Sequence, residues 1–100
     1  FEKLLQEMVK KKPKYIYFSG LNIYQKNIHD FIICKQFNVF PQINYCYFFK
    51  FDYLVNLICS MNYDLLYYSE NPNSKINYSH INSYLNESCQ YLDLFFKIKN

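Results

Sequence analysis

The chain contains a single glycine, Gly20, and its position constrains the fold more than any other feature. Gly20 and Ser19 follow four strand-favouring residues, Tyr15 to Phe18. Glycine accepts a positive φ, or a close approach of another group to the backbone, without steric cost. A sequence that has nearly eliminated glycine but keeps one after a buried-looking strand has a geometric reason for it. We expect Ser19 and Gly20 to form a solvent-exposed turn that ends this strand.

Length and composition indicate one domain. A chain of 100 residues, 51% of them apolar, is long enough for one hydrophobic core but not for two. It begins with Phe1 rather than Met, so we expect it to be part of a longer protein. Ala, Arg, Thr and Trp are absent, and the abundant residues have AT-rich codons. We therefore interpret the twelve Tyr and ten Phe mostly as core residues, not as evidence of an aromatic binding surface.

The charge pattern does not favour nucleic acid as the main partner. All eleven basic residues are Lys, the formal net charge is +3, and the one basic cluster is Lys10–Lys12 with Lys14. Nucleic-acid modules usually present a basic stripe and read base edges with Arg. The longest uncharged run, Gln36 to Phe49, is too short to span a bilayer, and no signal peptide opens the chain. We expect a soluble, intracellular protein with no membrane partner.

The sequence shows no pattern typical of a catalytic or metal site. One glycine cannot form a phosphate-binding loop, and no Ser, Cys or His lies in a recognisable nucleophile motif. His29 beside Asp30 is interpreted as a solvated pair. Four cysteines lack metal-ligand spacing to a histidine and are interpreted as reduced, mostly buried thiols: Cys34, Cys46, Cys59 and Cys89. We expect no enzymatic activity, no metal and no cofactor.

Hydrophobic spacing predicts strands that alternate with helices. The predicted elements are a helix over 1–13, a strand over 14–18, a helix over 22–37, a strand over 43–51 after a break at Pro41, a short helix capped by Asp52, a strand over 63–68 and a last helix over 79–92. Such alternation favours an α/β fold with a small, mainly parallel sheet flanked by helices. Residues 1–13 are expected to be an N-terminal helix or linker, and residues 14–100 one compact domain.

Several segments, taken in order, resemble the BRCT family. Phe18-Ser19-Gly20-Leu21 is similar to the family's opening strand and turn. Tyr45 to Phe49, Tyr53 to Ile58 and Tyr63 to Tyr68 resemble its next strand, its second helix and its last strand. Tyr84-Leu85-Asn86-Glu87-Ser88 is similar to the family's Trp-Leu-x-Asp/Glu-Ser/Cys on the final helix.

The resemblance covers Lys14 to about Lys97 and departs from the family at several points. Asn38-Val39 stands where the family often has Gly-Gly, and the family's Thr-His and Trp are absent. The link from Ser69 to Tyr78 is longer than usual. The order of the segments, rather than any one motif, therefore carries the resemblance.

The BRCT resemblance implies the order β-α-β-β-α-β-α, here preceded by one extra helix, and a non-enzymatic protein-interaction module. In the phosphopeptide-binding subset, a Ser hydroxyl, a Gly N–H and a Lys at the second helix hold the phosphate. The matching positions are Ser19, Gly20 and Lys50. Phosphoserine carries about −1.5 to −2 charges and suits such donors, although Asp52 beside Lys50 would repel it. The structural alternative is that Ser19 and Gly20 form a plain turn.

The resemblance also implies a cellular setting. The leading hypothesis is a nuclear protein of DNA-damage signalling or replication that binds a phosphorylated protein partner. The alternative is a structural scaffold domain in a ribosome-assembly or other ribonucleoprotein particle, as in pescadillo-like BRCT domains. A third hypothesis is a degenerate α/β domain in a protein whose work is done by other domains.

Overall fold

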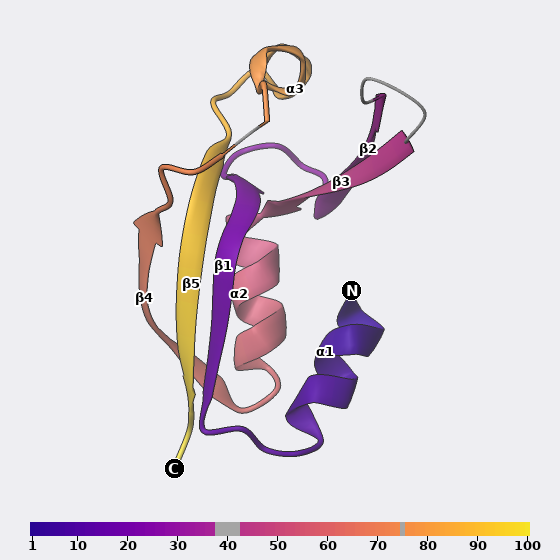
Figure 1. Ribbon diagram of the computed structural model, residues 1–100. Helices are drawn as coiled ribbons and strands as arrows, with labels where there is room; N and C mark the ends of the chain where they lie inside the picture. Colours follow the sequence, from indigo (N-terminus) through magenta and orange to yellow (C-terminus); the bar gives the residue numbers. More distant parts are fainter. Residues whose placement is uncertain (38–42, 75) are drawn as a thin grey trace.

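The structure is a computed structural model that describes residues 1–37, 43–74 and 76–100 (Figure 1). The elements in chain order are α1 (Glu2–Val9), β1 (Tyr15–Tyr24), β2 (Phe31–Phe37), β3 (Ile43–Lys50), α2 (Phe51–Cys59), β4 (Tyr63–Glu70), α3 (Ser79–Leu85) and β5 (Gln90–Ile98). The helix predicted before Pro13 and the strands predicted over 43–51 and 63–68 are confirmed. The expectations at Pro41 and at Asn38-Val39 lie outside the described residues.

The five strands form one sheet in the order β2-β3-β1-β5-β4. β1 and β3 are parallel, whereas the pairs β1·β5, β2·β3 and β4·β5 are antiparallel. The expected α/β class, a sheet flanked by helices, is confirmed, but the expectation of a mainly parallel sheet is wrong. The reason is that β2 stands where a helix was predicted, that β5 was not predicted as a strand, and that both pair with antiparallel neighbours.

The helix predicted over 22–37 is wrong. This segment is the end of β1, a loop and then β2, which pairs with β3 in the register Phe31↔Phe49 to Phe37↔Ile43. β-Branched and aromatic residues such as Ile32 favour strands. In a chain that is half apolar, helical spacing recurs by chance, so the pattern in this segment carried little information.

The helix predicted over 79–92 is confirmed only in its first half. α3 ends at Leu85, and Asn86 follows in the left-handed conformation with φ 57°. β5 then begins at Gln90 and lies between β1 and β4 in the sheet. Its residues alternate in burial, with three side chains at 1% exposure or less: Leu92, Leu94 and Phe96.

Gly20 lies inside β1, so the expected turn is wrong while its geometric reason is confirmed. β1 continues to Tyr24, and Gly20 has φ +78°. The Tyr91 ring lies so close that a Cβ built on Gly20 would meet it at 2.4 Å. The residue therefore combines a left-handed backbone with a close approach of another side chain, and both require glycine.

A β-bulge at Gly20 changes which side chains of β1 face the core. Phe18 pairs with Leu94 and Leu21 pairs with Leu92, so β1 contains one residue more than β5 between these pairs. Strict alternation would turn Leu21 to the face opposite Phe18. The extra residue instead keeps Ile16 and Ile23 in the same buried cluster.

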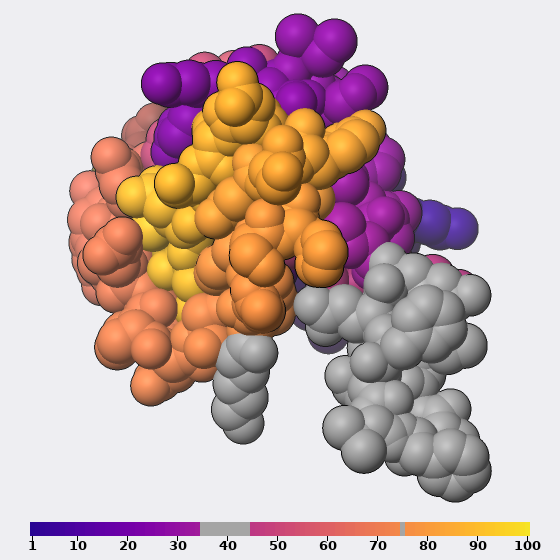
Figure 2. Space-filling view, turned by 90° about the horizontal axis from the view of Figure 1, so that it is seen from above, coloured from indigo at the N-terminus to yellow at the C-terminus, as the bar shows by residue number. Residues whose placement is uncertain are grey.

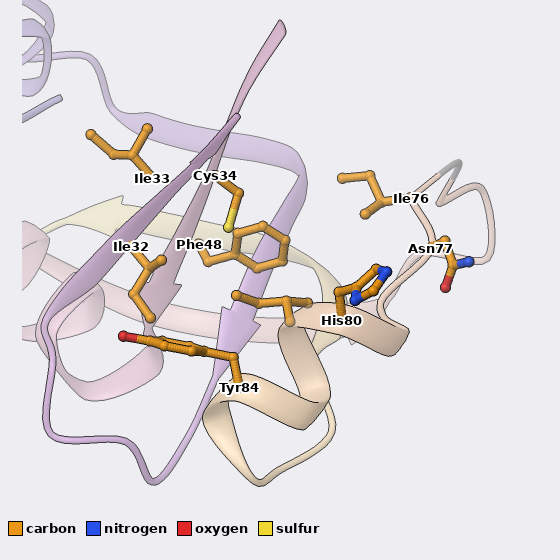
Figure 3. Close-up of a pocket in the computed structure, with 9 residues that line it drawn as sticks. Ile32, Ile33, Cys34, Phe48, Ile76, Asn77, His80 and Tyr84 are labelled. Carbon is orange, nitrogen blue, oxygen red and sulfur yellow. The ribbon is translucent and has the colours of Figure 1, made fainter. Parts of the chain in front are cut away.

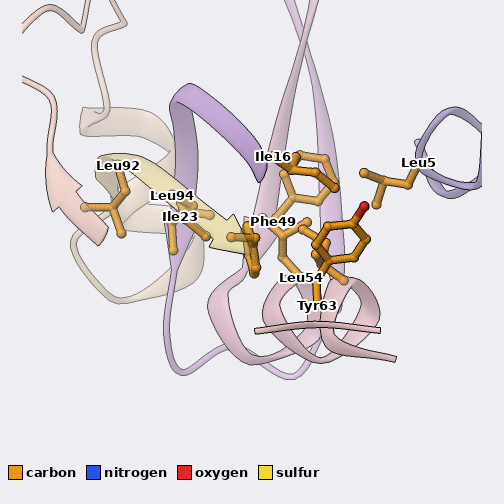
Figure 4. Packing of buried hydrophobic residues seen from close by; sticks show 10 residues of the cluster. Leu5, Ile16, Ile23, Phe49, Leu54, Tyr63, Leu92 and Leu94 are labelled. Atoms are coloured by element: carbon orange, nitrogen blue, oxygen red, sulfur yellow. The ribbon is translucent and has the colours of Figure 1, made fainter. Parts of the chain in front are cut away.

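One face of the sheet packs against α1 and α2 (Figures 1 and 4). Leu5 of α1 and Leu54 of α2 are at most 1% exposed and contact side chains from the central strands. The cluster consists of Leu5, Ile16, Ile23, Phe49, Leu54, Ile58, Tyr63, Leu92, Leu94 and Phe96. This is the main hydrophobic core.

The opposite face is covered at one end only. Phe48 neighbours Phe49 in β3 and points to the other face, where it packs with Tyr24, Ile81 and Leu85. Figure 2 views this end of the molecule and shows α3, in orange, over it. Tyr24 is fully buried there, and burial is the main cause that raises its pKa to about 12. Toward the other end of β1, β5 and β4, the same face carries exposed side chains.

Candidate functional site

The three residues predicted to bind phosphate do not lie together. Ser19 is exposed in β1 and Gly20 is beside it in the bulge. Lys50 is the last residue of β3 and pairs with Tyr24, four positions beyond Gly20. At about 3.3 Å per strand residue, this places Lys50 roughly 13 Å along the sheet from Gly20.

Lys50 has acidic neighbours where it lies. It is the N-cap of α2, and no side chain caps this helix, so the prediction of Asp52 as N-cap is wrong. The Lys50 N–H donates to the carbonyl of Asp30 at 2.9 Å. Lys50, Asp30, Asp52 and Tyr53 line the same shallow hollow. Two carboxylates beside one ammonium make this an unfavourable place for a phosphate.

The predicted donor at Gly20 already has an anionic partner, Asp93. The Gly20 N–H donates to Oδ1 of Asp93 at 2.8 Å, and Nδ2 of Asn71 donates to the same oxygen at 2.9 Å. The Tyr17 hydroxyl donates to Oδ2 at 3.1 Å. The hydrogen bond from Asn71 is the largest cause that lowers the pKa of Asp93, and those from Tyr17 and Gly20 add to it against desolvation. Asp93 therefore stays ionised, and its charge repels a second anion at this position.

A second carboxylate of the chain, Glu87, lies in an anion-binding site formed by the loop that follows β1. The backbone N–H groups of Gln25, Lys26 and Asn27 donate to it at 2.9–3.0 Å. Consecutive N–H groups that converge in this way form an anion-binding nest. Burial raises the pKa of Glu87, but the three donors and the Lys26 charge outweigh it, so the net pKa is lowered. This nest uses none of the three residues predicted to bind phosphate, and the chain's own Glu87 occupies it.

Four aromatic side chains gather on the uncovered part of the sheet. We define the aromatic patch as Tyr15, Tyr17, Tyr67 and Phe95, which come from the three adjacent strands β1, β4 and β5. The Phe95 ring lies at the centre, with centroid distances of 5.4 Å to Tyr15, 5.9 Å to Tyr17 and 5.3 Å to Tyr67. The three tyrosines are 46%, 52% and 54% exposed. The patch is a rigid apolar surface with hydroxyl groups at its margin.

The charges around the aromatic patch have both signs. The Lys14 ammonium lies 5.6 Å from the centre of the Tyr15 ring, within cation–π range. Lys97 pairs with Tyr15 across β1·β5, and Asp64 pairs with Lys97 across β4·β5. Asp93 pairs with Ser69 two positions from Phe95. Mixed charge of this kind favours binding of a protein partner over binding of a polyanion such as a nucleic acid.

An apolar hollow of about 580 Å³ lies between the β2–β3 hairpin and α3 (Figure 3). Its lining residues are Ile32, Ile33, Cys34, Phe48, Ile76, Asn77, His80, Ile81 and Tyr84. Burial raises the pKa of the Cys34 thiol. The neighbouring Cys89 has its pKa raised to about 11, also mainly by burial. These thiols are therefore neutral, and nothing in the hollow activates them as nucleophiles.

Over the described ranges, no three His, Cys, Asp or Glu side chains are placed to hold a metal ion. None of the helices in those ranges has the length and apolar character needed to cross a bilayer. The described cysteines are free thiols, each partly buried: Cys34, Cys46, Cys59 and Cys89.

Sequence reasoning missed the aromatic patch because it assigned the aromatic residues mostly to the core. Seven of the twelve tyrosines are in fact strongly exposed: Tyr15, Tyr17, Tyr45, Tyr47, Tyr67, Tyr68 and Tyr84. A signal was present in the alternation of Leu92, Leu94 and Phe96 with Asp93, Phe95 and Lys97. It marks a strand with one buried face, and Phe95 then lies on the other face.

Comparisons of this chain with protein-family models, with curated proteins and with solved structures found no match.

Proposed function

We propose that the chain is a non-enzymatic protein-interaction module that binds a protein partner through the aromatic patch. The observation that carries this proposal is the cluster of three half-exposed tyrosines around Phe95 on an uncovered sheet face. Contiguous exposed apolar patches on soluble domains mark interaction sites. Tyrosine is among the residues that dominate binding energy in protein interfaces.

The proposal does not place a phosphate at Ser19. The Gly20 N–H that would hold it donates to Asp93, and Lys50 lies elsewhere on the sheet. A partner that binds the patch instead gains from apolar burial against the rings and from hydrogen bonds to the tyrosine hydroxyls. Membership of the BRCT family, a nuclear location and a role in DNA repair or ribosome assembly stay predictions from the sequence.

The experiment selects peptides from a displayed library on the wild-type chain and measures their affinity for patch variants. We expect the double variant Tyr15→Ser/Tyr67→Ser to bind the selected peptides at least tenfold more weakly. The matched control is Tyr84→Ser, because Tyr84 is 68% exposed but lies on α3, away from the patch. Tyr17 is left unchanged in these variants, because its hydroxyl donates a hydrogen bond to Asp93.

Two results would overturn the proposal. One is that all selected peptides bind the double variant as tightly as the wild type. The other is that a fluorescent single-stranded oligonucleotide binds the patch with a steep salt dependence while no peptide does. The second result would favour the ribonucleoprotein alternative, since stacked aromatic rings also bind unpaired bases.

A further inference from the structure

One edge of β1 lacks a neighbouring strand over most of its length. β5 pairs with β1 from Tyr15 to Ile23 on one side. On the other side, β3 pairs only with Asn22, Ile23 and Tyr24. Within the described residues, no strand therefore lies against the second edge from Tyr15 to Leu21, although β1 is a central strand of the sheet.

The unpaired edge exposes backbone groups of Tyr15 and Tyr17. The Ile98 N–H donates to the Lys14 carbonyl at 2.9 Å, so Lys14 directs its backbone groups toward β5. Antiparallel pairing alternates, and Ile16 and Phe18 accordingly face β5 as well. The N–H and C=O groups of Tyr15 and Tyr17 point the other way. Such a row of unpaired groups is a template for another strand.

Two hollows are lined by residues of both α1 and β1, and together we call them the groove. One hollow, of about 590 Å³, has Met8, Lys11 and Tyr17 among its lining residues. A second, of about 350 Å³, has Leu4 and Leu21 among its own. Leu4 is 63% exposed. The groove thus has two recesses placed in order along β1, each with apolar side chains in its lining.

The charge at one end of the groove is positive. Lys11 lines the first hollow together with Glu7, whose carboxylate forms an ion pair with Lys10 at 2.8 Å. The ion pairs of the described residues include neither Lys11 nor Lys12. A carboxylate at this end would therefore meet an ammonium group that has no other anionic partner there.

We infer that the edge from Tyr15 to Leu21 takes up an extended, partly acidic segment of a partner protein as an added β-strand. The partner must be a polypeptide, because only a polypeptide presents alternating N–H and C=O groups at the spacing of β1. Alternate apolar side chains of the segment enter the two hollows, and its acidic end meets Lys11. This inference rests on the proposed function in that the partner is a protein; it uses the backbone edge of β1, and only Tyr15 and Tyr17 belong both to the first hollow and to the aromatic patch.

Hydrogen exchange of the free chain tests the edge without a ligand. We expect the amides of Tyr15 and Tyr17 to exchange at least tenfold faster than those of Ile16 and Phe18, which face β5. Equal protection of all four amides in dilute solution would overturn the inference. Protection that appears only at high concentration would assign the edge to a second copy of this chain instead.

Binding is then tested with a displayed library of nine-residue peptides. We expect the library to yield peptides that lose at least tenfold in affinity for Leu4→Asp but bind the control Gln6→Asp normally, since Gln6 is exposed on α1 outside both hollows. Lys11→Glu is expected to weaken the acidic members among them. Circular dichroism confirms that each variant folds. A library that yields no peptide with this sensitivity would overturn the inference.

Backbone methylation of a selected peptide identifies the mode of binding. Methyl groups on the alternate amides that face β1 are expected to weaken binding at least tenfold, and methyl groups on the other set to have little effect. Equal effects of both sets would overturn strand addition. Tyr67→Ser separates the two proposals, because Tyr67 is in the aromatic patch but lines neither hollow. Peptides that respond to Leu4→Asp but not to Tyr67→Ser bind the edge, and peptides with the opposite response bind the aromatic patch, so either proposal can fail without the other.

Discussion

The two ends of one sheet face differ in what covers them, although the same strand supplies both. Tyr24 and Tyr17 point to the same face of β1 because the bulge at Gly20 lies between them. Tyr24 is fully buried under α3, whereas Tyr17 is 52% exposed. The residue type and the strand are the same, so only the path of the segment that leads to α3 makes one tyrosine a core residue. An aromatic residue in this chain therefore has no fixed role until its tertiary neighbour is known.

The largest expected effect is at the covered end. Tyr24→Ala should lower the free energy of unfolding by about 3–5 kcal/mol, because it removes a fully buried ring and its hydrogen bond to the His29 carbonyl. Tyr67→Ala on the same face should lower it by about 1 kcal/mol or less. Urea denaturation measures both. Equal losses would contradict the difference between the ends.

The next largest loss of stability is expected at the bulge, which lies in β1 between the covered and the uncovered end of the face. Gly20→Ala should destabilise the chain by about 2–4 kcal/mol, since it adds left-handed strain to a contact with Tyr91. Ser19→Ala at the neighbouring exposed residue should change stability by less than about 0.5 kcal/mol. A second change, Tyr91→Ala, should recover part of the loss in Gly20→Ala. A Gly20→Ala variant as stable as the wild type would show that the bulge does not need glycine.

The next prediction concerns Glu87, which follows α3 and accepts hydrogen bonds from the loop after β1. Glu87→Gln should cost about 1–2 kcal/mol, because it weakens three hydrogen bonds from the loop after β1. The folded-state pKa of Glu87 is lowered, so its contribution to stability is complete above the unfolded pKa of about 4.3 and is lost as the pH falls through the folded-state pKa. The melting temperature of the variant should therefore fall less than that of the wild type in this acidic range. If the melting temperatures of the two proteins fell in parallel with pH, the Glu87 carboxylate would not stabilise the loop after β1.

The smallest stability effect should accompany the clearest change in binding. Tyr15→Ser/Tyr67→Ser alters side chains that solvent already reaches, so the melting temperature should shift by only a few degrees. Binding of patch-directed peptides should nevertheless fall at least tenfold. Differential scanning calorimetry and fluorescence anisotropy on the same samples separate the two quantities. A large thermal shift would mean that the patch supports the fold, as Tyr24 does.

Local patterns predicted the elements whose signal is complete within one segment. The alternation of Tyr45 and Tyr47 with Cys46 marked β3, and the spacing of Leu54 and Ile58 marked α2. β2 was not predicted, because its apolar residues also fit a helix and only pairing with β3 decides between the two. β5 was not predicted, because its first residues were assigned to the last helix, although Leu92, Leu94 and Phe96 alternate. The reason for Gly20 was readable from composition, but the bulge depends on Tyr91 and Leu92, some seventy positions later.

The candidate site was less predictable than the fold for a related reason. A Ser-Gly pair after a strand indicates exposed donors, but the sequence does not show that Asp93 accepts the Gly20 N–H. Nor does it show that Lys50 meets Tyr24 rather than Ser19. The aromatic patch joins β1, β4 and β5, so it exists only once the strand order is known.

The extra residue in β1 also prevents the strand from sliding. A shift of β1 by two positions along β5 would keep every side chain on its own face, and aromatic residues would still meet aromatic or aliphatic ones. It would, however, carry the left-handed unit away from the Tyr91 ring and the Asp93 carboxylate, and put a residue with a side chain in its place. The misaligned pairings that such repetitive strands otherwise allow are therefore disfavoured, and one glycine helps to fix the register of the two central strands β1 and β5.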